Sequence, residues 1–214
     1  MRPWRGNRVW QIIYPIAMYY VIYNILYTLF RYLFRESENA LFCLGLASML
    51  TIPFLYTMYK RAPVVRPAKW FERQTIVKEL LYILGIVIFG IALNIIISHT
   101  PLAEQSAQFA KANATLLSGK LVTKIYANCI CIPILEEIVY RGIVCGQLQI
   151  WTNQTAAVVI SAFLFGIMHF NLVQFLYGFL VGLVLSYVYT KTNKLWVVIL
   201  AHSLTNLIVV IFHV

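Results

Sequence analysis

Apolar residues run along most of this chain in stretches long enough to cross a lipid bilayer. A membrane-spanning helix needs about 20 mostly apolar residues. The pattern predicts an all-α fold, a polytopic membrane helix bundle of about seven helices (six to eight) around a conical or cavity-containing core. The predicted spans are residues 9–34, 40–59, 79–98, 121–146, 156–170, 172–190 and 195–213.

The spacing of these stretches adds three expectations. Residues 156–170 and 172–190 are nearly contiguous, which predicts a tight or partly re-entrant hairpin. The first stretch is longer than a signal-peptide core, so we expect it to be retained as a helix. The polar segments 60–78 and 99–120 are short enough to be loops, so residues 1–214 should form a single integral membrane domain.

The composition supports membrane integration. Of 214 residues, 61% are apolar and 11% are charged, against roughly 45–50% and about 25% in average soluble domains. The net charge is +10, from 17 Lys and Arg against seven Glu. In a soluble protein this excess would suggest nucleic acid, whereas in a membrane protein it is typical of basic cytoplasmic loops. We therefore expect a lipid bilayer and no nucleic acid as a partner.

The basic residues are distributed unevenly among the predicted loops. Cytoplasmic loops carry an excess of Lys and Arg, and the basic clusters share one side if the N-terminus is cytoplasmic. We therefore expect a multi-pass protein of the cell membrane with its C-terminus outside. The clusters are Arg2, Arg5 and Arg8; Lys60, Arg61, Arg66, Lys69, Arg73 and Lys78; and Lys191 and Lys194. The tryptophans fall at the same boundary, as interfacial indole rings do: Trp4, Trp10, Trp70, Trp151 and Trp196.

The four cysteines lie within apolar stretches and are too few for a disulfide framework. Cys129 and Cys131 are two residues apart, so on a helix they point to nearly opposite sides. We expect all four to be small packing residues: Cys43, Cys129, Cys131 and Cys145.

The fourth apolar stretch contains three ionisable residues, and such residues are costly inside a bilayer and seldom without a role. Glu137 and Arg141 are four apart on one helix face, which predicts an internal ion pair. Glu136 is turned by roughly 100° from Glu137, so its carboxylate is left for another partner. Glu136 is the candidate general base or acid, and the alternative is a second acid that shares Arg141.

Two later stretches add polar residues one helical turn apart. Phe165 and His169 are four apart, so the ring can pack beside the imidazole, and His202 and Asn206 share one face in the same way. A lone histidine in an apolar helix is more often a packing residue. Polar groups from three helices, however, each need a partner inside the bundle. Two other histidines should face water at helix ends, without a role: His99 and His213.

These residues match a known pattern. The chain resembles the CAAX protease and bacteriocin-processing family, also called the Abi family, of intramembrane proteases, and within it the type II CAAX endopeptidases. That family shows Glu-Glu-x-x-x-Arg, Phe-x-x-x-His and His-x-x-x-Asn or Asp on successive membrane helices. Here the motifs occupy residues 136–141, 165–169 and 202–206, complete and in order. The resemblance covers residues 121–214, the expected catalytic core, whereas the N-terminal half matches only as generic membrane helices.

The resemblance implies that Glu136 and His169 activate a water molecule that attacks a peptide carbonyl. It also implies that His202 and Asn206 stabilise the developing oxyanion, a role suited to N–H donors. No cofactor is required. The expected substrate is a small peptide or a prenylated or otherwise lipid-anchored protein, entering from the cytoplasmic leaflet of a bacterial inner or plasma membrane. The residues expected to support the site are Glu137, Arg141 and Phe165.

Three alternatives stay open. One Glu and two His can bind Zn²⁺ with water as the fourth ligand, although the His-Glu-x-x-His motif of many zinc proteases is absent. The chain could instead be a non-catalytic bacteriocin-immunity or membrane scaffold protein. A transporter is the third alternative, but the first three helices hold few polar residues.

The predicted spans also set the depth of each side chain. Counted at about 1.5 Å per residue from the inner boundaries, His169 lies deeper than Glu136, and His202 lies shallower. We therefore expect the three to meet only if the short fifth helix begins inside the bundle.

Overall fold

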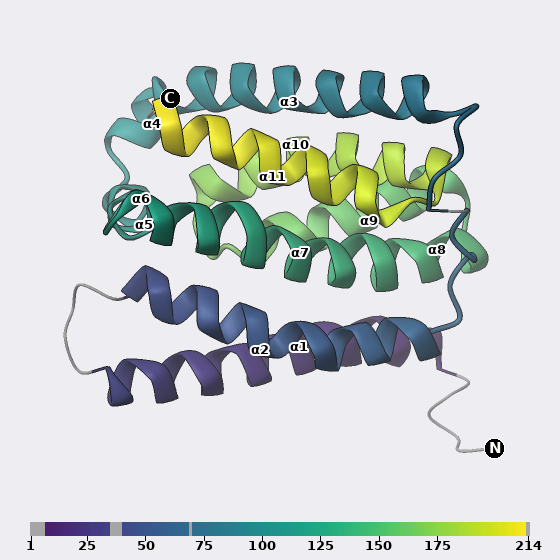
Figure 1. Cartoon of the computed structure of the whole chain (residues 1–214), viewed down its shortest axis with the longest axis horizontal. Coiled ribbons are helices and arrows are strands. Elements are labelled where there is room, and N and C mark those ends of the chain that lie inside the picture. Colours follow the sequence, from purple (N-terminus) through teal and green to yellow (C-terminus); the bar gives the residue numbers. More distant parts are fainter. Residues whose placement is uncertain (1–6, 35–39, 69, 213–214) are drawn as a thin grey trace.

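The computed structural model describes residues 7–34, 40–68 and 70–212, and every regular element in these ranges is helical (Figure 1). The predicted all-α polytopic bundle is confirmed. The elements are α1 (Arg8–Leu33), α2 (Ala40–Arg61), α3 (Ile76–Ser98), α4 (Pro101–Glu104), α5 (Ala107–Leu116), α6 (Leu121–Lys124), the π-helical η3 (Ile125–Cys131), α7 (Ile132–Glu137), the π-helical η4 (Ile138–Cys145), α8 (Gly146–Trp151), α9 (Gln154–Ile167), α10 (Leu172–Thr192) and α11 (Leu195–Phe212).

Each predicted stretch corresponds to a helix or a helical run. Five helices are long and apolar enough to cross a membrane: α1, α2, α3, α10 and α11. The segments from α6 to α8 follow one another without a break and form one run over residues 121–151, which we call the central run. The predicted tight hairpin is formed by α9 and α10, and α9 has only 14 residues.

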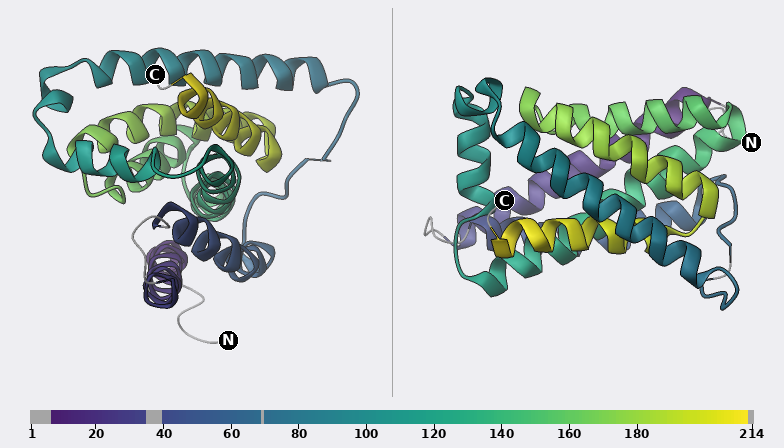
Figure 2. Two further views of the ribbon diagram at one scale, coloured as in Figure 1. Left: turned by 60° about the vertical axis from the view of Figure 1, so that its left-hand side comes forward. Right: turned by 90° about the horizontal axis from the view of Figure 1, so that it is seen from above.

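The central run lies in the middle of the bundle. Helices α2 and α1 lie on one side of it, with α1 outermost, and α9, α10 and α11 lie on the other (Figure 1). Figure 2 shows α3 crossing over α10 and α11 on the outside of this second group. All eight residues of η4 are buried, whereas Pro15 is the one fully buried residue of α1. The core is therefore built around the segment that carries the first motif.

Three differences from the predictions affect the site. The central run continues to Trp151 rather than ending at 146, and α9 ends at Ile167 rather than 170. The segment 99–120, predicted to be a loop, contains α4 and α5. The start of α5 has a local cause, since the Ser106 hydroxyl accepts a hydrogen bond from the N–H of Phe109 at 3.2 Å. Such a cap before an alanine-rich segment favours a helix.

The two ends of the bundle differ in charge. One end, which we call the α5 end, carries α4, α5 and α6, and the opposite end carries α8 and the turn between α10 and α11 (Figure 1). We call the second the basic end, because the described basic clusters gather there: Arg8, Lys60, Arg61, Arg66, Arg73, Lys78, Lys191 and Lys194. The four described tryptophans lie at the same end: Trp10, Trp70, Trp151 and Trp196. Outside the described residues lie Arg2, Trp4, Arg5, Lys69 and His213.

Candidate active site

The first motif begins in α7, a short α-helical segment between two π-helical segments, and its Arg141 lies in the second of these, η4. Pro133 accounts for the first of these. The N–H of Ile132 donates to the carbonyl of Ala127, five residues back, and Pro133 has no N–H. Neither residue therefore donates to the carbonyl of Asn128, which instead accepts a hydrogen bond from Nδ2 of Asn206 at 2.8 Å. A π-helical turn at this point thus positions a side chain of the third motif, as such turns often do at functional sites.

Glu137 lies at the centre of a buried charged network. The predicted ion pair is present, with Nη1 of Arg141 at 2.8 Å from Oε1 of Glu137 and both side chains fully buried. The same oxygen also accepts a hydrogen bond from Nδ1 of His202 at 2.8 Å. Because a carboxylate only accepts, Nδ1 of His202 carries the proton. Arg141 is held further by the carbonyl of Gly182, at 3.4 Å from Nη2.

Glu136 is turned away from this ion pair, as the helical period predicts. Its side chain is 14% exposed, and its Oε2 lies 4.0 Å from Nε2 of His202. It makes no hydrogen bond with any described residue, and the described partners of the Arg141 guanidinium are Glu137 and Gly182. The alternative in which Glu136 shares Arg141 therefore finds no hydrogen bond in its favour.

The ring of Phe165 joins the three motifs. The guanidinium of Arg141 lies over its face, 4.3 Å from the ring centroid, a cation–π geometry. The imidazole of His169 meets it edge-on at 5.2 Å, as predicted from the spacing, and that of His202 does so at 6.1 Å. One aromatic ring therefore fixes both imidazoles relative to the buried cation.

His169 lies just beyond α9, in the turn to α10, and not within a helix as the predicted span had it. The next residue, Phe170, has a φ of 51°, a left-handed conformation that is uncommon for a non-glycine residue and recurs at functional sites. Nδ1 of His169 donates to the carbonyl of Phe165 at 3.1 Å. Since a carbonyl only accepts, Nδ1 carries a proton, and in the neutral imidazole Nε2 then carries the lone pair.

The observed boundaries explain how side chains at different predicted depths meet. Glu136 precedes the end of the central run by 15 residues, and His169 follows the start of α9 by 15 residues. At 1.5 Å per residue both lie about 22 Å from the basic end. His202 follows the start of α11 by fewer residues, but Lys194 in the preceding turn is buried. The Nδ1 of His202 nevertheless lies 2.8 Å from Oε1 of Glu137, the residue next to Glu136. The three side chains therefore meet although the fifth helix begins at the basic end.

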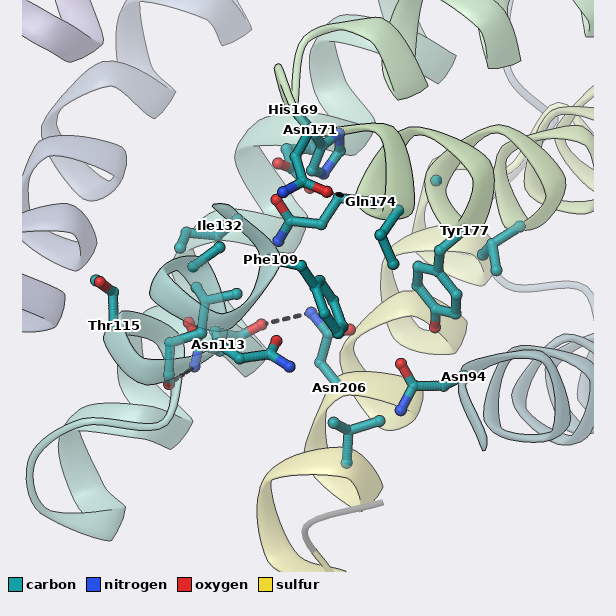
Figure 3. A pocket seen from close by; sticks show the side chains of 18 of the residues that line it. Asn94, Phe109, Asn113, Thr115, Ile132, His169, Asn171, Gln174, Tyr177 and Asn206 are labelled. Carbon is teal, nitrogen blue, oxygen red and sulfur yellow. Dashed lines mark hydrogen bonds between the residues drawn. The ribbon is translucent and has the colours of Figure 1, made fainter. Parts of the chain in front are cut away.

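All four predicted catalytic side chains line one cavity of about 830 Å³, within the range of ligand-binding sites. Figure 3 shows His169 and Asn206 on different walls of it, with Asn171 and Gln174 beside His169. The structure thus brings together Glu136, His169, His202 and Asn206, whose catalytic roles stay predictions. Amide side chains complete much of the lining: Asn94, Gln108, Asn113, Asn128, Asn171 and Gln174.

Two parts of this site were missed from the sequence. One wall of the cavity is formed by α5, in a segment predicted to be a loop. Asn128 belongs to none of the three motifs. Its Nδ2 donates to the carbonyl of Leu116 at 2.6 Å and so connects the end of α5 to the central run. Ser106 before an alanine-rich segment was an available signal for α5. No signal in one sequence reports the contact between Asn128 and Leu116.

Metal-binding side chains are present but not closely grouped. Within the described residues, no three His, Cys, Asp or Glu side chains are placed to hold a metal ion together. The donor set that a zinc ion would use is nevertheless on the cavity wall, in Glu136 and the two imidazoles. The four cysteines are buried and form no disulfide, as expected of packing residues.

The comparisons with known proteins agree with the motifs. Residues 118–208, which contain all three motifs, match the model of the type II CAAX prenyl endopeptidase Rce1-like family. The predicted family resemblance is confirmed. The matched segment overlaps the predicted catalytic core and includes the central run, α9, α10 and most of α11.

Two curated bacterial proteins are also similar. The chain is 42% identical over 79 residues to "Putative membrane peptidase YdiL" of Bacillus subtilis (strain 168), which covers 37% of this chain and 32% of that protein. It is 27% identical over 135 residues to "UPF0177 protein YxdF" of Lactococcus lactis subsp. lactis (strain IL1403), covering 61% of this chain and 75% of that protein. The aligned segment thus spans about a third of the first relative. No solved structure matches the chain significantly.

Proposed function

We propose that this protein is an intramembrane endopeptidase that hydrolyses a peptide bond with a water molecule activated by Glu136 and His169. One observation carries the proposal. A carboxylate without a hydrogen bond to any described residue lines the same cavity as an imidazole whose Nδ1 is held by the carbonyl of Phe165, which leaves its Nε2 for the water. The Rce1-like match over residues 118–208 and the peptidase named among the relatives support the same activity.

The reaction follows from the two acceptors. Glu136 takes a proton from water while Nε2 of His169 accepts the other O–H, which orients the oxygen toward the substrate carbonyl. The water oxygen forms a bond to the carbonyl carbon, and the carbonyl oxygen becomes an oxyanion. The C–N bond then breaks, and the departing nitrogen takes the proton held by Glu136. The products are a carboxylic acid and an amine.

Asn206 and His202 are the proposed donors to the oxyanion. Nδ2 of Asn206 has two N–H groups, and the carbonyl of Asn128 accepts from one of them, which leaves the second. His202 donates from Nδ1 to Glu137, so its Nε2 can donate only when the ring is protonated.

The substrate class in this proposal is a small peptide or a prenylated or otherwise lipid-anchored protein. The neutral amide lining supports a peptide, because primary amides both donate and accept hydrogen bonds, as a peptide backbone does. A catalytic zinc ion held by Glu136, His169 and His202 is the alternative form of the same activity, with water activated by the metal.

A cleavage assay on the purified chain in detergent tests the proposal. The probes are a defined mixture of unmodified peptides and farnesylated peptides ending in a CAAX sequence, with products identified by mass spectrometry. We expect cleavage by the wild type and a loss of at least 100-fold for Glu136→Gln and His169→Ala, since a general base contributes 10²–10⁴-fold. Cleavage that persists in both folded variants would refute the mechanism.

Chelation separates the two forms of water activation. With 1,10-phenanthroline present, cleavage is expected to continue at its original rate. A complete loss that added Zn²⁺ reverses would replace the glutamate mechanism with the zinc mechanism. No cleavage by any form of the folded wild type, together with a phenotype that survives both substitutions, would favour an immunity or scaffold protein.

A further inference from the structure

The cavity that holds the candidate catalytic residues reaches the surface at one end of the bundle. Three of its exposed lining residues belong to α5 or follow the end of α3, and the fourth lies in the turn between α9 and α10: His99, Gln108, Lys111 and Phe170. Within the described residues, none of its lining comes from the basic loop 60–78, from α8 or from the turn between α10 and α11. A smaller cavity of about 320 Å³ lies at the basic end and is lined by none of the four candidate residues.

The distribution of charge distinguishes the two sides of the membrane. Of the described Lys and Arg residues, eight lie at the basic end. Four lie at the α5 end: Arg31, Lys111, Lys120 and Lys124. Loops rich in Lys and Arg stay in the cytoplasm when they are short, as the segment 62–75 between α2 and α3 is. The basic end therefore faces the cytoplasm, and the α5 end faces away from it.

These two observations combine into one inference. We infer that the catalytic cavity opens on the extracytoplasmic side of the membrane, beneath α5, and receives peptide segments presented at that face. The part that concerns the substrate rests on the proposed function, whereas the side of access does not. Cytoplasmic entry, as expected from the family, is incompatible with this orientation. The exposed lining of the cavity on α5 lies at the opposite end of the bundle from α8 and the turn between α10 and α11 (Figure 1).

The wall of the entrance suits an uncharged, extended peptide. Gln108 and Asn113 of α5 and Asn94 of α3 offer amide groups along the way to the site. Lys111 is the one Lys or Arg among the described lining residues, and Glu136 lies at the inner part of the cavity. An exported peptide, or an outer segment of a membrane protein, can therefore enter without burying a charge of its own.

Cysteine labelling tests the side of access without any need for cleavage. Lys111→Cys places a thiol at the entrance, and Arg66→Cys is the matched control, since Arg66 is an exposed basic residue of the loop at the basic end. The full-length chain is expressed in a bacterial inner membrane, and the native cysteines are buried, so the wild type gives the background. A membrane-impermeant maleimide is added to intact spheroplasts and, separately, to inverted vesicles.

We expect Lys111→Cys to be labelled at least tenfold more than Arg66→Cys in spheroplasts, with the ratio inverted in inverted vesicles. The opposite ratios would place the entrance in the cytoplasm, and equal labelling from both sides would show a mixed orientation. Either result overturns the inference. So does an absence of labelling of Lys111→Cys in detergent, because α5 then does not border an open entrance.

A second thiol links the entrance to the site. Val209→Cys lies on the cavity wall in α11, and a small charged methanethiosulfonate added to spheroplasts should modify it. After purification, the modified protein should cleave the peptide mixture at least tenfold more slowly, whereas modified Arg66→Cys should keep its rate. Labelling at Lys111→Cys without modification at Val209→Cys would refute access from that side. If the wild type cleaves nothing, the proposed function fails, yet the labelling still decides the side of access.

Discussion

Two buried clusters of charge lie at different heights in this bundle, and they use their hydrogen bonds differently. The Lys194 cluster, formed by Glu72, Thr75, Glu79 and Lys194, joins the start of α3 to the turn before α11. Nζ of Lys194 donates to Glu79, to Thr75 at 3.1 Å and to Glu72 at 3.4 Å. An ammonium group has three N–H donors, so this cluster has no donor to spare.

In the Glu136 cluster, formed by Glu136, Glu137, Arg141 and His202, the hydrogen bonds converge on Glu137. Oε1 of Glu137 accepts from both Arg141 and His202, but the nearest charged partner of Glu136 is 4.0 Å away. Glu136 also lines the large cavity. The difference teaches which buried charge is available for chemistry: the one that faces a cavity and lacks hydrogen bonds, and not the one that is most deeply buried.

The largest effect should come from exchanging one glutamate in each cluster for its neutral isostere. Glu136→Gln removes the proposed base, and we expect a loss of roughly 10³-fold in cleavage with an unfolding midpoint near that of the wild type. Glu79→Gln should have the opposite effect. It should lower the stability and leave the cleavage rate per folded molecule unchanged, because Lys194 loses its closest partner. Cleavage kinetics and unfolding in detergent measure both. If Glu136→Gln mainly destabilised the fold, Glu136 would belong with the structural charges.

Much of this comparison was visible in the sequence. The spacing of Glu137 and Arg141 predicted their ion pair because i,i+4 neighbours on a helix are set by the helix itself. The same local rule predicted that Phe165 packs beside His169, and hydropathy predicted the bundle. Contacts between distant segments were not visible. The hydrogen bond of His202 to Glu137 spans 65 residues, and that of Lys194 to Glu79 spans 115, and such pairings depend on how helices pack.

The errors have equally local causes. Hydropathy placed the end of the central run at 146, because the polar residues Gln147 and Gln149 interrupt the apolar stretch, yet the helix continues to Trp151. Gln147 is fully buried, and its Nε2 donates to the carbonyl of Gln11 in α1 at 3.1 Å. A buried polar residue that donates to another helix therefore resembles the end of a helix in the sequence. Placing the end of the central run too early made Glu136 appear shallower than His169.

The next largest effect concerns the closed side of the Glu136 cluster. Arg141→Met leaves the fully buried Glu137 without its guanidinium, and breaking a buried ion pair in this way costs about 3–5 kcal/mol of unfolding free energy. The double variant Glu137→Gln with Arg141→Met should recover part of that loss, because no uncompensated charge remains. Unfolding in detergent completes the double-mutant cycle. Additive losses would show that the two side chains contribute independently.

A smaller effect is expected from the residue that positions Asn206. Asn206→Ala removes a proposed oxyanion donor and should lower kcat by about 100-fold. Pro133→Ala restores an N–H that can compete with Asn206 for the carbonyl of Asn128, so we expect about a tenfold loss in kcat with an unchanged KM. Combined with Asn206→Ala, Pro133→Ala should add nothing further. A change in KM instead of kcat would mean that Pro133 acts on something other than Asn206. So would a double variant in which the two losses in kcat multiply fully.

The smallest effect is the pH dependence of the Lys194 cluster. The hydrogen bond to Glu79 is the main cause that raises the pKa of Lys194 above its ordinary value, which is about 10.4 in unfolded chains. Because the folded-state pKa is raised, the stabilisation is complete below the unfolded-state pKa and is lost as the pH rises through the folded-state pKa. Lys194→Met should therefore be less stable than the wild type at pH 7, by about 1–3 kcal/mol, with cleavage per folded molecule unchanged. The two unfolding midpoints should converge as the pH rises through the raised folded-state pKa of Lys194. If they diverged instead, the ammonium of Lys194 would not be the stabilising group, and the contrast between the two clusters would fail.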